Sequence, residues 1–184
     1  MTSFSGLPLT RDSVLEAHKL IAPHVHRTPV LRCRTLDEFA SAERKPGGAR
    51  PVVRLWFKCE NLQRIGAFKA RGAFHAVGRL VETGWKGGVV THSSGNHAQA
   101  LALAARENGI PAHIIMPSIS NPMKVAATQG YGAKVYFSGS TAPEREALAD
   151  EVMEKTGARM VPPYDHPDVI LGQARCGVVV EEGP

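Results

Sequence analysis

From about residue 68 onward, apolar strand-like segments alternate with alanine-rich helical segments, and this alternation constrains the fold more than any other feature of the sequence. Short turns of Gly, Ser, Asn and Pro separate the segments. The pattern predicts strands over 88–92, 112–116 and 134–137, and helices over 68–82, 96–108, 121–129, 142–155 and 167–182. Strands that alternate with helices of this length form βαβ units with right-handed crossovers. We therefore predict an α/β fold with a mostly parallel sheet.

The N-terminal third is less regular. A helix is predicted over 10–21, with Thr10 or Asp12 as its cap and Pro23 as its stop. Further predictions are a strand over 29–32, a helix over 36–44, a loop over 45–51 and a strand over 52–59.

The composition, with 43% hydrophobic and 21% charged residues, is typical of a soluble globular protein. The longest apolar runs, such as 112–117, are far shorter than the roughly 20 residues of a membrane-spanning helix, so we expect no membrane contact. The N-terminal segment lacks the pattern of a secretory signal.

Three widely spaced cysteines, Cys33, Cys59 and Cys176, favour buried, reduced thiols and a cytoplasmic location.

The net charge of +5 is concentrated in the N-terminal half. Its basic residues are scattered singly and aromatic residues make up only 6% of the chain, so we expect no nucleic-acid partner. The excess charge fits either solvated surface or binding of a small anionic ligand.

Two predicted strand-to-helix turns carry residue types suited to chemistry, and ligands of open α/β sheets bind at such turns. The first places Lys69 just inside a helix start, beside Phe68. The helix dipole and the apolar neighbour both disfavour the ammonium form and lower the lysine pKa. Such an amine can form a Schiff base with a carbonyl cofactor. The alternative is a lysine that is merely solvated.

The second turn runs through Ser93, Ser94 and Gly95 into the helix predicted from residue 96. Small hydroxyl and glycine residues at this junction form a nest of N–H donors suited to a carboxylate or a phosphate. Alternatively, one of the serines simply caps the helix. His92 and His97 have no third ligand or carboxylate partner at a recognisable spacing, so we predict neither a metal site nor a catalytic triad.

Taken together, four ordered motifs resemble the pyridoxal-phosphate enzymes of the serine/threonine dehydratase and serine racemase family. The similarity is greatest to the branch of eukaryotic-type serine racemases and threo-3-hydroxyaspartate ammonia-lyases. The motifs are GAFKARGA around Lys69, THSSGNHAQALALAA at 91–105, KVAATQGYGAKV at 124–135 and PPYDHPDVILGQ at 162–173. The resemblance implies a three-layer αβα fold with a parallel sheet, the tryptophan-synthase-β-like fold type II, of which this chain would be a truncated, N-terminal half.

On the cofactor side, the resemblance implies that Lys69 forms the Schiff base with pyridoxal 5′-phosphate. Phe68 would pack beside the cofactor, and Asn96 would hydrogen-bond the pyridoxal 3′-oxygen.

On the substrate side, the resemblance implies that N–H groups of Ser93, Asn96 and His97 hold the carboxylate of a small amino acid. Ser94 would be the acid and base on the cofactor face opposite Lys69, which favours a racemase or a 3-hydroxyaspartate dehydratase. The implied reaction is β-elimination from serine, threonine or threo-3-hydroxyaspartate to a keto acid and ammonia, accompanied by serine racemisation.

The resemblance also implies a glycine-rich phosphate loop and, in this branch, a divalent-cation site. The sequence holds only isolated glycine pairs, at 47–48 and 87–88, and we expect no cation site in it. Two hypotheses stay open. The chain is part of a working dehydratase or racemase, or it is a non-catalytic remnant or interaction module that self-associates through an unpaired sheet edge.

The domain prediction follows the same resemblance. Residues 1–71 would belong to a large cofactor domain, 72–164 would form a small α/β domain, and 165–184 would return to the large domain.

Overall fold

The computed structural model describes residues 9–181, with the side chains of residues 9–176. In this part of the chain the helices are α1 (Arg11–Ile21), α2 (Arg34–Ala40), α3 (Lys69–Glu82), α4 (Asn96–Glu107), α5 (Pro122–Gly130), α6 (Ala142–Thr156) and α7 (Pro167–Glu181). The strands are β1 (Val30–Arg32), β2 (Trp56–Lys58), β3 (Val89–His92), β4 (Ala112–Pro117), β5 (Lys134–Ser138) and β6 (Arg159–Met160). Residue 182, the predicted end of the last helix, lies outside the described residues.

The main sheet is parallel and has the strand order β5-β4-β3-β6. The predicted α/β fold with a parallel sheet is therefore confirmed. β6 was not predicted, because two residues are too few to show a period. It forms because the N–H of Arg159 donates to Gly88 and the N–H of Val161 donates to Val90, at 3.1 and 2.9 Å.

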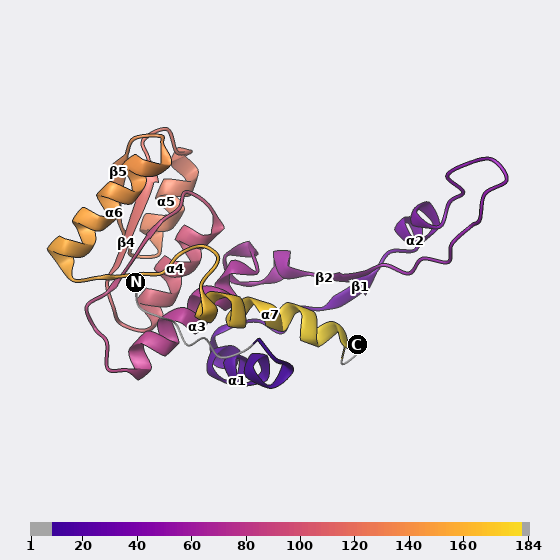
Figure 1. The fold of residues 1–184 in the computed structure, drawn as a ribbon, viewed down its shortest axis with the longest axis horizontal. Coiled ribbons are helices and arrows are strands. Elements are labelled where there is room, and N and C mark those ends of the chain that lie inside the picture. The colour runs from indigo at the N-terminus through magenta and orange to yellow at the C-terminus, as the bar shows by residue number, and fades with distance from the viewer. Residues whose placement is uncertain (1–8, 182–184) are drawn as a thin grey trace.

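The main sheet is the middle of three layers, as predicted (Figure 1). Alternate side chains of one strand point to opposite faces. Val89 and Ile114 pack with Leu101 of α4 on one face, whereas Val90 and Ile115 pack with residues of α6 on the other. All five of these side chains are fully buried. Burial of these two apolar faces stabilises the βαβ units and fixes the edge of the sheet at which its turns meet.

Helix α7 returns along the chain to pack against α3 and α1 (Figure 1). Glycines make the approach to α3 close. A Cβ at Gly172 would lie 2.6 Å from the carbonyl oxygen of Arg71 and 2.9 Å from the Cα of Gly72. A larger residue at Gly172 would therefore push the two helices apart, so this contact fixes the helix that begins at Lys69.

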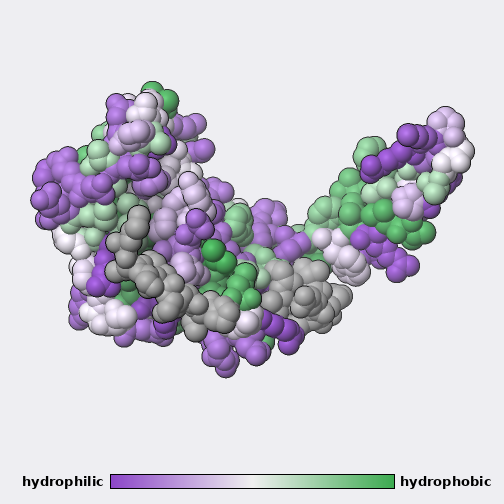
Figure 2. Space-filling model, viewed as in Figure 1, coloured by the Kyte–Doolittle hydropathy of each residue, from purple (hydrophilic) through white to green (hydrophobic). Residues whose placement is uncertain are grey.

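Residues 30–58 form an arm that extends away from the rest of the molecule (Figure 1). Its base is the antiparallel pair β1 and β2, with Val30 opposite Lys58, and α2 lies farther out. Apolar side chains gather on the arm (Figure 2), and the large ones that are exposed are Leu31, Leu36, Phe39, Val52, Trp56 and Phe57.

The arm corrects two predictions. The predicted helix over 36–44 lies at Arg34–Ala40, and the predicted strand over 52–59 is confined to Trp56–Lys58. The reason is that side chains take the backbone donors of the intervening segment. The N–H of Val53 donates to Ser41 Oγ at 2.9 Å, and the N–H of Leu55 donates to Asp37 Oδ1 at 2.6 Å. These residues are therefore held by α2 and its end instead of by a strand.

The predicted domain boundary between residues 71 and 72 falls inside α3, which is continuous from Lys69 to Glu82. The division into a large and a small domain stays a prediction.

The three cysteines are free and half-buried, whereas buried thiols were predicted. In residues 9–181, no helix is both long and apolar enough to cross a membrane. The same residues contain no group of three or more His, Cys, Asp or Glu side chains that could hold a metal ion.

Candidate functional site

Lys69 is the first residue of α3, within one residue of the predicted helix start. Its Nζ donates a hydrogen bond of 2.5 Å to the carbonyl oxygen of Pro163 and lies 5.2 Å from the ring centroid of Phe68. Partial burial disfavours the ammonium form and lowers the lysine pKa. The direction agrees with the sequence prediction, although the cause that the structure gives is loss of solvation. Lys69 is therefore an amine that is more easily deprotonated than a surface lysine.

In the turn between β3 and α4, some backbone N–H groups are hydrogen-bonded within the sheet and others remain available to a ligand. The N–H of Ser93 donates to the carbonyl of Ile115 at 3.0 Å and so extends the sheet. Because this N–H is already bonded within the sheet, it does not fit the predicted contact with a substrate carboxylate. Ser93 can instead contact a ligand through its hydroxyl. The N-cap of α4 is Gly95, which has no capping side chain, so serine capping of this helix is not observed. The first N–H groups of α4, including those of Asn96 and His97, have no acceptor within the helix and can bind an anion.

A cavity of about 330 Å³ lies where the carboxyl ends of β3 and β4 meet the start of α6. It is lined by His92, Ser93, Ser94, Pro117, Ala142, Arg145, Glu146, Pro163 and Tyr164. The volume is at the lower end of the roughly 300–1,000 Å³ of small-molecule sites. The position agrees with the rule that ligands of α/β sheets bind at the carboxyl ends of strands. Lys69 reaches the wall of this cavity through its hydrogen bond to Pro163.

The side chain of His97 is 3% exposed and does not line the cavity. Its Nε2 lies 3.0 Å from the carbonyl oxygen of Val161. Because a carbonyl only accepts, Nε2 carries the proton and Nδ1 is unprotonated. Within the described part of the chain, the buried Nδ1 has no hydrogen-bond partner. Burial lowers the His97 pKa to about 4, so the ring is neutral near pH 7 and ties α4 to the segment that leads to Pro163.

The structure brings together some of the predicted site residues and separates others. Ser93 and Ser94 line the cavity. Lys69 and Phe68 do not line it, but Lys69 hydrogen-bonds the carbonyl of Pro163, which does, and Phe68 lies beside Lys69. Asn96 is exposed at the start of α4, and neither Asn96 nor His97 lines the cavity.

Sequence reasoning missed several residues that line this cavity, among them Arg145, Glu146 and Tyr164. The sequence does contain a signal that could have placed Arg145 at this site. Thr141 and Glu144 form a capping box that begins α6 a few residues after β5. The first turn of α6 must then lie at the same edge of the sheet as the turn after β3.

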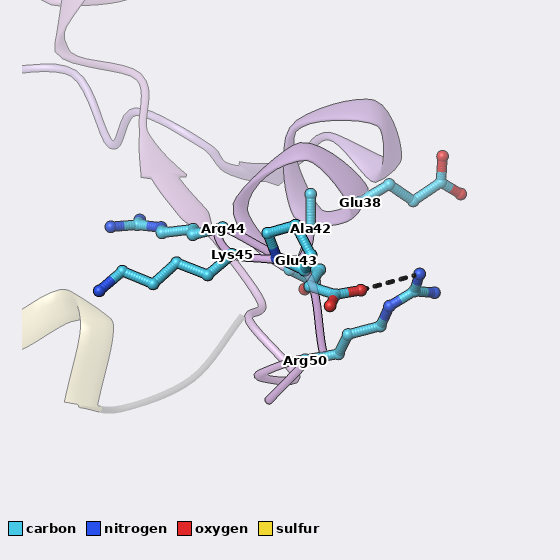
Figure 3. A pocket seen from close by; sticks show the side chains of 8 residues that line it. Glu38, Ala42, Glu43, Arg44, Lys45 and Arg50 are labelled. Atoms are coloured by element: carbon cyan, nitrogen blue, oxygen red, sulfur yellow. Dashed lines mark hydrogen bonds and ion pairs between the residues drawn. The ribbon is translucent and has the colours of Figure 1, made fainter. Parts of the chain in front are cut away.

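A second cavity, of about 720 Å³, lies on the arm (Figure 3). Its wall includes Glu43 and Arg50, which form an ion pair at 3.4 Å, and the side chains of Arg44 and Lys45 extend together to one side (Figure 3). These groups are charged and mostly exposed, and neither predicted turn contributes to this cavity. We assign no chemistry to it.

Comparison with known proteins gives the family. A family model described as "Pyridoxal-phosphate dependent enzyme" matches residues 21–182. The chain therefore belongs to this family of pyridoxal-phosphate dependent enzymes, as the four motifs predicted. Membership implies pyridoxal phosphate as the cofactor.

The relatives are amino-acid racemases and lyases. The chain is 46% identical over 165 residues to serine racemase of Schizosaccharomyces pombe, covering 89% of this chain and 47% of the relative. It is 45% identical over 160 residues to L-threo-3-hydroxyaspartate ammonia-lyase of a Pseudomonas species, covering 87% and 47%. The solved structure of maize serine racemase superposes with a TM-score of 0.83 at 40% identity, covering 94% of this chain and 50% of that one. The chain thus spans about half the length of the relatives it matches.

The residues present fit one part of pyridoxal phosphate. An amine with a lowered pKa hydrogen-bonds the carbonyl of Pro163, and Pro163 lines a cavity together with two serines, Arg145 and Glu146. These groups suit the aldehyde and the polar ring substituent of the cofactor. The glycine-rich phosphate loop that the resemblance implies has no counterpart among the 184 residues.

Proposed function

We propose that this chain supplies the lysine-bearing part of the active site of a pyridoxal-phosphate dependent enzyme. The enzyme would eliminate water from a small β-hydroxy amino acid, and hydrolysis of the product would give a keto acid and ammonia. Racemisation of serine would accompany this elimination. The observation that carries the proposal is the hydrogen bond from Lys69, whose pKa is lowered, to Pro163, which lines the same cavity as Ser93 and Ser94. The serine racemase and hydroxyaspartate ammonia-lyase relatives support the reaction class.

Lys69 would hold the cofactor and then act as the base. When bound, pyridoxal phosphate supplies an electron sink for the negative charge that develops at the substrate α-carbon. Lys69 would bind the cofactor aldehyde through Nζ, with Phe68 beside it. Once displaced, the amine would take the α-proton, and its lowered pKa would favour the neutral form that this step needs.

The turn between β3 and α4 would bind the substrate. The free N–H groups of Asn96 and His97 at the start of α4 would hold the carboxylate, and the Asn96 side chain would contact the ring oxygen of the cofactor. The hydroxyl of Ser93 would add a hydrogen bond. Ser94 would exchange a proton with the α-carbon on the face opposite Lys69, which racemisation requires and elimination does not.

Arg145 bears on the choice of substrate. Its guanidinium donates to the carbonyl of Ser140 at 2.7 Å and lines the same cavity as Ser93 and Ser94. Glu146 also lines this cavity. The guanidinium of Arg145 can pair with a second substrate carboxylate, and a 3-hydroxyaspartate has one. Among serine, threonine and threo-3-hydroxyaspartate, we propose the last as the preferred substrate.

The test uses pyridoxal phosphate with the chain as it exists. Visible absorbance is recorded before and after borohydride reduction, and the modified lysines are mapped by peptide mass spectrometry. Lys69 should be modified in preference to Lys19, whose side chain is 72% exposed on α1. Lys69→Ala should lose the absorbance, and Lys19→Ala should keep it. Equal modification of many surface lysines, or an unchanged absorbance in Lys69→Ala, would remove Lys69 from this role.

A second candidate function is favoured by the arm. Its exposed apolar side chains, including Phe39 and Val52, would suit an interaction module that lacks catalysis. Self-association through the edge strand β5 belongs to the same proposal. Three results together would favour this function over the enzyme. Pyridoxal phosphate would not modify Lys69 selectively, the chain would not turn over substrate, and light scattering would show a defined oligomer.

Two further parts of the proposal concern the whole enzyme. The divalent cation expected for this branch would be held by residues other than those of this sequence. A cytoplasmic location is proposed on the free, widely spaced cysteines.

A further inference from the structure

The loop that leads to Lys69 has an unusual backbone. It contains two short 3-10 helices, Glu60–Leu62 and Arg64–Gly66. Ile65 in the second has a φ of 57° and a ψ of 11°, the left-handed conformation that β-branched residues rarely adopt. A strained loop persists only where surrounding contacts hold it. The contacts around this loop therefore decide where Lys69 lies.

A buried ion pair closes the loop onto α3. Arg71 Nε donates to Glu60 Oε2 and Arg71 Nη2 donates to Glu60 Oε1, both at 2.8 Å. The side chain of Arg71 is 3% exposed and that of Glu60 is 14% exposed. The Oγ1 of Thr28 donates a further hydrogen bond of 2.6 Å to Glu60 Oε1. A bidentate, charge-assisted pair with a third donor defines both the distance and the angle between the loop and the helix.

The same loop is tied a second time to one extended segment. Gln63 Nε2 donates to the carbonyl of His26 at 2.8 Å, and Gln63 Oε1 accepts from the N–H of His26 at 2.8 Å. Arg71 Nη2 also donates to that carbonyl, at 3.3 Å. The segment from His26 to Thr28 thus anchors the loop before Lys69 and the helix after it.

The ion pair acts from the side of α3 that faces away from the cavity. Arg71 follows Lys69 by two positions, which is roughly 200° around the helix axis. Lys69 hydrogen-bonds Pro163, which lines the cavity, whereas Arg71 and Glu60 neither line the cavity nor hydrogen-bond a residue that does. The pair therefore lies outside the cavity lining and can act on the site by fixing the first turn of α3.

We infer that Glu60 and Arg71 are positioning residues for Lys69: their ion pair, anchored by Thr28, fixes the first turn of α3 and so the placement of the Lys69 amine at the cavity wall. This inference rests on the proposed role of Lys69. Loss of the pair leaves Lys69 chemically intact but allows its amine to occupy more positions.

The experiment compares Glu60→Gln and Thr28→Val with the parent chain and with Val77→Ala. Thr28→Val removes one hydrogen bond to Glu60 and changes no charge. Val77→Ala, at a fully buried position of the same helix, serves as a destabilised control that leaves the ion pair intact. Each variant is first shown to be folded by circular dichroism, and the urea midpoint of unfolding is measured.

Two readouts follow. The first is the ratio of Lys69 to Lys19 modified by pyridoxal phosphate and borohydride. The second is the pH dependence of acetylation of the same two lysines by acetic anhydride, which needs no cofactor site. In the parent, the midpoint of Lys69 acetylation should lie below that of Lys19, because burial lowers the Lys69 pKa.

We expect Glu60→Gln to lower the Lys69 preference about tenfold and Thr28→Val several-fold, because small displacements of a reacting group cost large factors in rate. Both should move the Lys69 acetylation midpoint toward that of Lys19, whereas Val77→Ala should change stability alone. If Thr28→Val and Glu60→Gln unfold more easily but keep the parent's acetylation midpoint, the ion pair is only structural and the inference fails. If the parent shows no cofactor preference for Lys69 but the acetylation midpoints still shift, the proposed function fails and the positioning role stands.

Discussion

Acid should weaken the fold of this protein through His97, and the size of the effect follows from the burial of its imidazole. Burial lowers the His97 pKa to about 4, against the usual 6.5 that applies in an unfolded chain. A histidine with a lowered folded-state pKa takes up its proton on unfolding. Its contribution to stability is therefore complete above pH 6.5 and is lost as the pH falls toward 4. With these values, the free energy of unfolding should fall by about 2 kcal/mol between pH 7 and pH 5.

The assay is urea unfolding of the parent and of His97→Gln, followed by circular dichroism at pH 7, 6 and 5. Glutamine can keep an N–H donor for the carbonyl of Val161 but does not titrate. Between pH 7 and pH 5 the variant should therefore lose less stability than the parent. His75 and His113, whose pKa values burial also lowers, account for a residual change of the same sign. Glu60, whose pKa is lowered, loses its contribution only at still lower pH.

An equal loss of stability in the parent and in His97→Gln would refute this reasoning. It would mean that the imidazole is solvated in the folded chain, or that another group takes up the proton.

Two further predictions concern Ser94 and Gly172. Ser94→Ala, in a preparation that turns over serine, should reduce racemisation far more than elimination, as measured by chiral chromatography and a keto-acid assay; equal losses would make Ser94 merely structural. Gly172→Ala should lower the free energy of unfolding by about 1–3 kcal/mol, because its Cβ would lie 2.6 Å from the carbonyl oxygen of Arg71; an unchanged urea midpoint would contradict the close contact of α3 and α7.

The βα units could be predicted from the sequence because their information is local. Helix α4 begins at Asn96 as predicted, and its alanines and Leu101 repeat with a helical period. The arm could not be predicted to the same accuracy. Whether residues 52–55 form a strand depends on Ser41 and Asp37, which capture the N–H groups of Val53 and Leu55 from many positions away. Side-chain acceptors of this kind leave no periodic trace in the sequence.

For the candidate site, the sequence indicates which residues gather but not how each is used. Ser93 and Ser94 line the cavity, as their place after a strand predicts. The use of the Ser93 N–H depends on where β3 ends against β4, since that N–H donates to Ile115 and not to a ligand. His97 was predicted through its N–H, and its buried ring and contact with Val161 depend on β6, which the sequence did not reveal.

In this chain, binding of the cofactor aldehyde by Lys69 should not depend on binding of the cofactor phosphate. The contacts that place Lys69 all come from residues of this sequence: Glu60, Arg71, Thr28 and Pro163. The phosphate loop implied by the resemblance has no counterpart in it. Pyridoxal, which lacks the phosphate, should therefore modify Lys69 about as selectively as pyridoxal phosphate does, when borohydride-reduced peptides are compared at equal aldehyde concentration. A preference of tenfold or more for the phosphorylated form, worth about 1.4 kcal/mol, would mean that residues of this chain bind the phosphate themselves. Arg145, the cation that lines the cavity, would then be the first residue to substitute.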